Sequence, residues 1–306
     1  MKLLVLGGSG FVSGHLARMA QALGHQVWCL TRGQRASLQG IRYLRADRND
    51  EKGLLRVLED TGVQFDAVMD CICFDREQAG IDLRVLPRFT KQAVVISTDS
   101  VYHPAHKAVP QAEESDHYMQ DGGYGCKKRQ MEEAFLADPG PLPWTLLRPG
   151  HIFGPGSEIG CFPEHSRQKN LLSHMRQDQP LRLVGGGKYL IHPIYVEDLC
   201  RCMLACVGNP ACYRQIFCVG GPDIVENAQY YEIIGSLIGH PARIESIPEE
   251  GYLAAHPEFS GHLCHRAYSL EKLKNAGVPL PDTHLADGLK RQIEWLDSRD
   301  HASSEA

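Results

Sequence analysis

Three side chains in the middle of the chain could carry out acid-base chemistry on a carbon that bears oxygen. Tyr124 and Lys128 stand four residues apart at the start of a predicted helix, so the phenol and the ammonium project from one face of it. A nearby ammonium favours the phenolate and lowers the pKa of a phenol whose ordinary value is about 10. Tyr124 could then exchange a proton with a substrate hydroxyl or carbonyl. Thr98, at the end of a predicted strand, could hold the same oxygen.

A dinucleotide site is predicted at the beginning of the chain. A glycine-rich turn with Gly7 and Gly10 joins an apolar strand to an amphipathic helix that begins with Phe11 and Val12. Glycine permits positive φ and lets the backbone approach a pyrophosphate closely. The N–H groups of the first helical turn then face the phosphates, where the helix dipole favours negative charge. The usual third glycine is replaced by Ser13, a small residue that weakens the match without abolishing it.

The ends of the next two predicted strands indicate which dinucleotide would bind. An acidic residue after the second strand would bind the adenosine ribose of NAD, but the sequence has Arg32 and Arg35 there. Two cations suit the 2′-phosphate of NADP, which makes NADP the favoured cofactor over NAD. The alternative is a pair of solvated loop arginines. Asp47 and Arg48, after the third strand, are placed to frame an adenine.

The order of apolar and amphipathic segments predicts an α/β fold. Short apolar strands alternate regularly with helices over the first 150 residues, so right-handed crossovers should form a Rossmann-type, doubly wound parallel sheet. Ligands of such sheets bind beyond the carboxyl ends of the strands, which is where the candidate residues lie.

The alternation breaks after Gly156, which indicates a second, smaller domain. We expect a nucleotide-binding domain over residues 1–155, rejoined by about 190–220. The substrate domain should comprise residues 156–189 and 221–297. The polar end of the chain, residues 298–306, is predicted to be a disordered tail.

The composition is that of a soluble globular protein. The chain has 306 residues, 43% of them hydrophobic and 23% charged, with a net charge of −5. Because there is no basic excess, nucleic acid is an improbable main partner. No apolar run approaches membrane-spanning length, and a strand starting at Lys2 leaves no room for a signal peptide. We therefore expect a cytoplasmic protein with a small-molecule substrate and no membrane partner.

The eleven cysteines are odd in number and form no paired CxxC units. Many lie in apolar runs, where free cysteine behaves as a small hydrophobe. They are interpreted as reduced thiols of a reducing compartment. His262, Cys264 and His265 form the one weak candidate for a metal site, but a second ligand pair is missing, so no metal is expected.

Taken together, the motifs resemble those of the extended short-chain dehydrogenases/reductases of the NAD-dependent epimerase/dehydratase family. The order of a glycine loop, a Ser-Thr strand end and YxxxK makes the match specific, whereas YxxxK alone is common by chance. The motifs, which span most of the chain, are Gly7-x-x-Gly10, Ser97-Thr98-Asp99-Ser100-Val101-Tyr102, Tyr124-x-x-x-Lys128, Arg148-Pro149 with Gly154-Pro155, and His192-Pro193-Ile194-Tyr195-Val196-Glu197-Asp198.

This resemblance implies that Thr98, Tyr124 and Lys128 are the catalytic residues. Lys128 would also bind the nicotinamide ribose, and Pro149 would lie against the cofactor. Family members commonly dimerise through a four-helix bundle that includes the YxxxK helix, so a homodimer is expected.

Departures from the family pattern bear on the substrate. Ser97-Thr98-Asp99 is similar to the Ser-Thr-Asp of sugar-nucleotide 4,6-dehydratases and dehydrorhamnose-type reductases. Dehydratases place a catalytic glutamate next, whereas this chain has Ser100, which argues against dehydration. His151 stands where many nucleotide-sugar enzymes have asparagine, so it is either a substrate contact or a packed histidine. Asp99, Ser100 and His151 are the candidate substrate residues.

The leading hypothesis is an NAD(P)-dependent oxidoreductase or epimerase that acts on a hydroxyl or carbonyl carbon, with a sugar nucleotide among the candidate substrates. The alternative is a nucleotide- or RNA-binding protein that has kept the fold. The sequence also resembles the chloroplast stem-loop-binding branch of the superfamily, in Leu30-Thr31-Arg32-Gly33, Asp47-Arg48 and Phe65-Asp66-Ala67-Val68-Met69-Asp70. The intact Thr, Tyr and Lys favour the enzyme.

Overall fold

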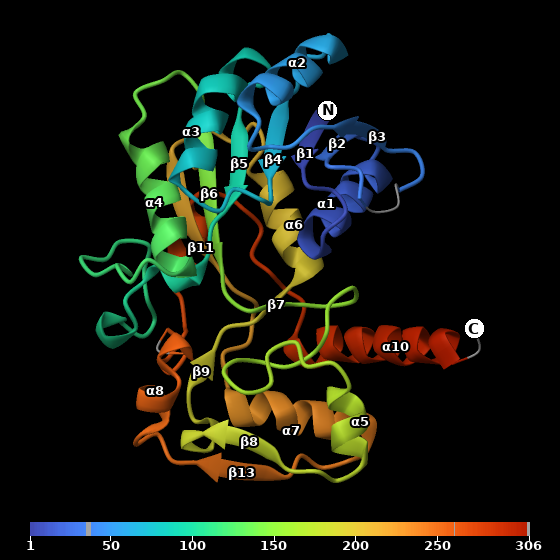
Figure 1. Ribbon diagram of the computed structural model, residues 1–306, viewed down its shortest axis with the longest axis vertical. Helices are drawn as coiled ribbons and strands as arrows, with labels where there is room; N and C mark the ends of the chain where they lie inside the picture. Colours follow the sequence, from blue (N-terminus) through green and yellow to red (C-terminus); the bar gives the residue numbers. More distant parts are fainter. Residues whose placement is uncertain (35–37, 260, 305–306) are drawn as a thin grey trace.

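A seven-stranded parallel sheet forms the centre of the larger lobe (Figure 1). The computed structural model describes residues 1–34, 38–259 and 261–304. The strand order is β11-β6-β5-β4-β1-β2-β3, which confirms the predicted doubly wound α/β fold. The strands are β1 (Lys2–Leu6), β2 (Gln26–Thr31), β3 (Arg42–Arg45), β4 (Ala67–Asp70), β5 (Ala93–Ile96), β6 (Trp144–Pro149) and β11 (Gln215–Val219).

Five helices cover the two faces of this sheet. They are α1 (Phe11–Ala22), α2 (Glu51–Thr61), α3 (Arg76–Val85), α4 (Tyr124–Ala137) and α6 (Val196–Ala205). Alternate residues of β1 separate the faces: Leu3 and Val5 pack with α1 and α6, whereas Leu4 and Leu6 pack with α2, α3 and α4. Successive side chains of a strand point to opposite faces of the sheet. Because both faces are buried here, the strands are apolar throughout.

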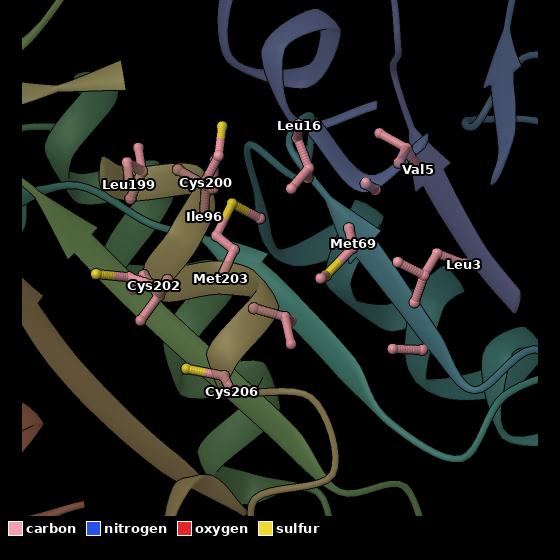
Figure 2. Close-up of a cluster of buried hydrophobic side chains, with 14 of the residues drawn as sticks. Leu3, Val5, Leu16, Met69, Ile96, Leu199, Cys200, Cys202, Met203 and Cys206 are labelled. Carbon is pink, nitrogen blue, oxygen red and sulfur yellow. The ribbon is translucent and has the colours of Figure 1, made fainter. Parts of the chain in front are cut away.

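The face beneath α6 is rich in sulfur-containing side chains. Figure 2 shows Cys200 and Met203 of α6 above the sheet, close to Leu16 of α1 and to Met69 and Ile96 of two neighbouring strands. All eleven cysteines are free. The close packing of small and polarizable side chains fits their interpretation as buried thiols.

The smaller lobe has its own apolar core beneath the sheet (Figure 1). Its elements are α5 (Leu171–Arg176), β8 (Leu181–Val184), α7 (Asn227–Ile238), β13 (Ile244–Ile247) and α10 (Leu285–Ser304). Strands β8 and β13 pair in parallel. Two further pairs are β7 (Ile152–Phe153) with β10 (Ile194–Tyr195), and β9 (Leu190–Ile191) with β12 (Val225–Glu226).

Short helices complete the chain between these elements. They are η1 (Leu86–Arg88), η2 (Asp99–Val101), η3 (Pro104–His106), η4 (Gly185–Gly187), η5 (Pro210–Cys212), α8 (Tyr252–Ala255), η6 (Pro257–Phe259) and α9 (Glu271–Asn275). In the part of the chain that the structure describes, no helix is long and apolar enough to cross a membrane.

The prediction of a disordered tail from residue 298 is wrong for residues 298–304. Helix α10 continues to Ser304. Arg299 forms an ion pair with Glu158, and Asp297 forms one with Arg176 at 2.8 Å. These contacts with the smaller lobe hold a polar segment that has no apolar pattern of its own. Residues 305–306 lie outside the described residues.

Candidate active site

The glycine-rich turn forms one wall of a cavity at the carboxyl ends of the central strands. Gly7 and Gly8 have φ values of +111° and +101°, and a Cβ on Gly8 would clash with the side chain of Cys29. Helix α1 then begins after Gly10, whose N–H donates to the Ser13 hydroxyl at 3.1 Å. Ser13, at the third position of the motif, therefore stabilises the turn through this hydrogen bond. Phe11 opens the first turn of the helix, followed by Val12.

This cavity, of about 480 Å³, also receives the ends of β2 and β3. Gly7, Gly10, Arg32, Asp47 and Arg48 all line it, so the structure brings together most of the predicted cofactor residues. A further cation lies nearby, because the Arg45 side chain sits 3.3 Å from where a Cβ on Gly33 would be. Arg35 lies outside the described residues.

Arg48 is held from within the protein. Its guanidinium donates to the Ile72 carbonyl at 2.9 Å and to Asp82 at 2.7 Å, and it lies 3.2 Å from Asp70. Burial and the neighbouring Asp70 carboxylate raise the pKa of Asp82. The side chain that the sequence placed against an adenine thus neutralises two buried carboxylates while forming part of the cavity wall.

The same carboxylates belong to the one group of three potential metal ligands found among the described residues. Asp70, Cys73 and Asp82 have ligand atoms within 4.8 Å of one another. The Arg48 guanidinium already supplies the positive charge between the two carboxylates, so these residues form an internal ion-pair cluster.

The three residues of the weak metal-site candidate, His262, Cys264 and His265, have other contacts in the structure. The Nδ1 atom of His265 accepts from the Leu190 N–H at 3.2 Å, and His262 stacks on Phe162 with ring centroids 3.9 Å apart. Cys264 lies 3.6 Å from the Lys107 ammonium. Each of the three side chains therefore contacts a different neighbour.

A second cavity, of about 640 Å³, contains the predicted reactive groups. Thr98 follows β5, Tyr124 begins α4, and both line this cavity together with Pro149 from the end of β6. Tyr124 is 54% exposed, whereas Thr98 is 7% exposed. The sequence therefore predicted correctly which elements bring the hydroxyl and the phenol to one place.

The pKa of Tyr124 is raised, contrary to the expectation. Desolvation by the cavity walls and the Asp99 carboxylate raise it, whereas hydrogen bonding toward Thr98 and the charge of Arg167 lower it. Lys128 is not among the groups that influence the phenol. The cation that lowers the pKa of Tyr124 is instead Arg167, which belongs to the smaller lobe.

Lys128 is buried beneath the end of the sheet, with 1% of its surface exposed. Its ammonium donates to the carbonyls of Cys73 at 2.6 Å and Ile96 at 2.7 Å. Burial lowers the pKa of Lys128 to about 8. The lysine thus ties α4 to the ends of β4 and β5, and it holds the helix that presents Tyr124.

One turn further along α4, Glu132 fixes the same helix face to the sheet. Its carboxylate accepts from the Ser97 hydroxyl at 2.6 Å and pairs with two nitrogens of Arg148 at 2.7 and 2.8 Å. Glu132 and Arg148 are both fully buried. Because Tyr124, Lys128 and Glu132 share one helix face, this ion pair and the lysine set the position of the phenol.

Asp99 is engaged by the smaller lobe. Its carboxylate pairs with two nitrogens of Arg266, one at 2.8 Å, and accepts from the Tyr268 hydroxyl at 2.7 Å. Burial alone would raise the pKa of Asp99, but the charges of Arg266 and Lys107 outweigh it and hold the pKa at about 2. Ser100 lies beside this pair and lines the cavity. Asp99 is therefore a fixed carboxylate and no proton donor.

Two neutral histidines complete the cavity wall. Burial and the charges of Arg167 and Arg266 lower the pKa of His151 to about 3, and its ring packs edge-on against Tyr230. Burial and Arg266 lower the pKa of His262 to about 4. His151 is thus packed against Tyr230 and also lines the cavity.

Sequence reasoning missed the cavity residues that the smaller lobe supplies. Arg167 and Arg266 carried no recognisable motif, and His262 was noted only as part of a weak metal candidate. Only the fold brings these three side chains to the cavity that contains Thr98 and Tyr124. Glu132 could have been found, because it stands four residues after Lys128 on the same helix face.

The sequence profile of the NAD dependent epimerase/dehydratase family matches residues 3–220. The chloroplast stem-loop binding protein of 41 kDa b from Arabidopsis thaliana is 26% identical over 305 residues, covering 94% of this chain and 77% of that protein. A dTDP-4-dehydro-6-deoxy-D-allose reductase from a Streptomyces species is 24% identical, covering 80% and 83%. A UDP-glucose 4-epimerase from Thermotoga maritima, solved with UDP-glucose, superposes with a TM-score of 0.78 at 18% identity, covering 98% and 99% of the two chains.

The family profile spans the glycine-rich turn, Thr98, Tyr124 and the last strand of the sheet. It therefore confirms the resemblance on which the sequence motifs had agreed. The chain belongs to the NAD-dependent epimerase/dehydratase family and is an NAD(P)-dependent enzyme of the extended short-chain dehydrogenase/reductase type.

Proposed function

We propose that this enzyme interconverts a hydroxyl and a carbonyl on a small molecule, with Tyr124 as the proton donor and acceptor. The observation that carries the proposal is the meeting of Tyr124 and Thr98 in the 640 Å³ cavity at the carboxyl end of the sheet. The phenol is half-exposed there, while the residues behind it are fixed by buried hydrogen bonds.

In the reduction direction, Tyr124 donates a proton to the carbonyl oxygen as it becomes a hydroxyl. In the oxidation direction, the phenolate removes that proton. Thr98 positions the same oxygen, and Lys128 and Glu132 keep α4 in register with the sheet. A bound nicotinamide supplies or accepts the hydride at the neighbouring carbon.

The 480 Å³ cavity fits a dinucleotide, since its wall is a turn in which added Cβ atoms would clash and from which a helix begins. Gly7, Gly10 and Phe11 would hold the phosphates, and Asp47 would face the adenine. Arg32 lines the same cavity, and with Arg45 nearby it favours the 2′-phosphate of NADP over NAD.

The substrate is proposed to be a ketone or secondary alcohol, with 4-keto sugar nucleotides among the candidates. The reductase relative acts, by its name, on a dTDP-linked dehydro sugar. Dehydration is disfavoured because Ser100 replaces the catalytic base and because Asp99 is paired with Arg266 and Tyr268.

The first experiment measures binding of NADPH, NADP⁺, NADH and NAD⁺ to the purified protein, after any retained nucleotide has been released and identified. Exchangeable binding that prefers NADPH supports a reductase. A tightly retained NAD⁺ supports an epimerase that regenerates its cofactor and refutes the role of Arg32. Binding of none of the four refutes the proposed activity.

The role of Tyr124 is tested with the variant Tyr124→Phe in an assay of NADPH oxidation with dTDP-4-keto-6-deoxy sugars and simple ketones. We expect turnover to fall by at least about a hundredfold, with dinucleotide affinity nearly unchanged. Preserved turnover with impaired dinucleotide binding would refute the acid-base role.

A second candidate function is RNA binding, which the similarity to the chloroplast stem-loop binding protein favours. The net charge of −5 and the intact Thr98, Tyr124 and Lys128 count against it. Salt-dependent retention of the protein on a stem-loop RNA would support this candidate, and elution that does not depend on salt would dismiss it.

We also propose a homodimer formed through α3 and α4, which pack against each other. Leu136, near the end of α4, is 49% exposed and would be covered in such a dimer. Sedimentation velocity of the protein and of the Leu136→Glu variant tests this arrangement.

A further inference from the structure

Arg167 is presented at the junction of the two lobes by a loop that precedes α5. It lines the 640 Å³ cavity with Tyr124 and His151. Its guanidinium lies 6.0 Å from the ring centroid of Phe11, the first residue of α1. The side chain therefore stands between the substrate cavity and the helix that begins at the glycine-rich turn.

Backbone hydrogen bonds hold Arg167 in an unusual conformation within this loop. Arg167 has a φ of +47°, a conformation that costs energy for any residue other than glycine. Its N–H donates to the Gly160 carbonyl at 3.3 Å, and Gln168 donates to Ile159 at 3.0 Å. The Cys161 N–H in turn donates to the Tyr231 hydroxyl of α7 at 2.9 Å.

The exposed guanidinium of Arg167 faces the Phe11 ring. Among the described residues, none forms a hydrogen bond or an ion pair with the Arg167 side chain. Arg266, in the same cavity, is instead neutralised by Asp99. Strained backbone occurs at ligand clamps, and a guanidinium without a protein partner is suited to an anionic ligand.

The position of this charge also matters for the reactive groups. Arg167 lowers the pKa of both Tyr124 and His151. A cation that stabilises the Tyr124 phenolate and can also form two parallel hydrogen bonds is suited to an anionic ligand beside the reacting carbon.

We propose that Arg167 binds an anionic group, a phosphoryl or a carboxylate, of a molecule held at the junction of the two cavities. This inference rests on the proposed function, because the junction lies between the dinucleotide and the substrate. Two sources share this chemistry: the phosphates of the dinucleotide, near Phe11, and an anionic group of the substrate, near Tyr124.

The test uses Arg167→Met and Arg167→Lys, with Lys169→Met as the matched control, since Lys169 is an exposed cation two residues away that lines neither cavity. The binding of NADPH and NADH is titrated by nicotinamide fluorescence. The binding of inorganic pyrophosphate to protein saturated with NADP⁺ is titrated by calorimetry. Thermal unfolding confirms that each variant remains folded.

If the dinucleotide supplies the anion, Arg167→Met should weaken NADPH binding by about tenfold or more, with partial rescue by lysine and no effect of Lys169→Met. If the substrate supplies it, NADPH binding should persist while pyrophosphate affinity falls by a similar factor. Unchanged binding of both probes overturns the inference and leaves the proposed function standing. If the wild type binds no dinucleotide, the proposed function fails, and pyrophosphate binding to the free protein still decides the role of Arg167.

Discussion

Replacing Lys128 with methionine should change the way in which stability depends on pH. The ammonium is buried with a pKa of about 8, compared with its ordinary value of 10.5. This difference of about 2.5 corresponds to about 3.4 kcal/mol, at about 1.36 kcal/mol for each pKa unit. That free energy is the cost of keeping the ammonium charged in the folded protein relative to the unfolded chain.

The sign follows from proton uptake. Between pH 8 and pH 10.5 the unfolded chain binds the lysine proton and the folded protein does not, so this group makes the protein more stable as pH rises. Below pH 8 both states are protonated and the full cost applies. About 2.5 kcal/mol of the change falls between pH 7 and pH 10.

The assay is urea unfolding of the wild type and of Lys128→Met at several pH values from 7 to 10. The wild-type free energy of unfolding, minus that of the variant, should rise by about 2.5 kcal/mol across this range. Taking the difference cancels the contributions of the buried thiols, which are common to both proteins. Lys127→Met, which removes an exposed neighbouring ammonium, should give a flat difference. A flat difference for Lys128→Met as well would refute a desolvated charge at this position.

Two further predictions concern the supports of the cavity. Glu132→Gln leaves the buried guanidinium of Arg148 without its carboxylate, so the free energy of unfolding should fall by about 3 kcal/mol or more in urea titrations; a loss below about 1 kcal/mol would contradict it. Arg266→Met removes the charge that holds the pKa of Asp99 at about 2, so this carboxyl should titrate above its ordinary value. The stability deficit of this variant relative to the wild type should then grow as pH rises from 4 to 7, whereas Arg266→Lys should reduce it; a deficit independent of pH would exclude this role.

The larger lobe could be predicted because its determinants are local. Leu3 to Leu6 form an unbroken apolar run, and both faces of the resulting strand are buried. The glycine turn and the spacing of Tyr124 and Lys128 likewise act within a few residues. Periodicity therefore identified each element and the end of the sheet at which ligands bind.

The electrostatic roles could not be predicted, since they depend on groups remote in sequence. Arg48 followed a strand in the position of an adenine contact, yet Asp82 of α3 and Asp70 of β4 take its charge. Lys128 has the spacing of a neighbour of Tyr124, yet the carbonyls of Cys73 and Ile96 draw its ammonium away. Helical spacing determines which side chains share a face of α4. The backbone carbonyls beyond the strand ends determine which hydrogen bonds the polar atoms of those side chains form.

The smaller lobe contributes most of the charged side chains that balance Asp99 in the 640 Å³ cavity. Asp99 and Arg266 neutralise each other, and the two histidines are uncharged near neutral pH. Arg167 then remains as a cation whose charge reaches the Tyr124 phenol. An anionic ligand on Arg167 would diminish that influence, so the pKa of Tyr124 should rise when the ligand binds. In the proposed mechanism, the loop before α5 would therefore couple the charge of a bound ligand to Tyr124, the proposed proton-transfer group.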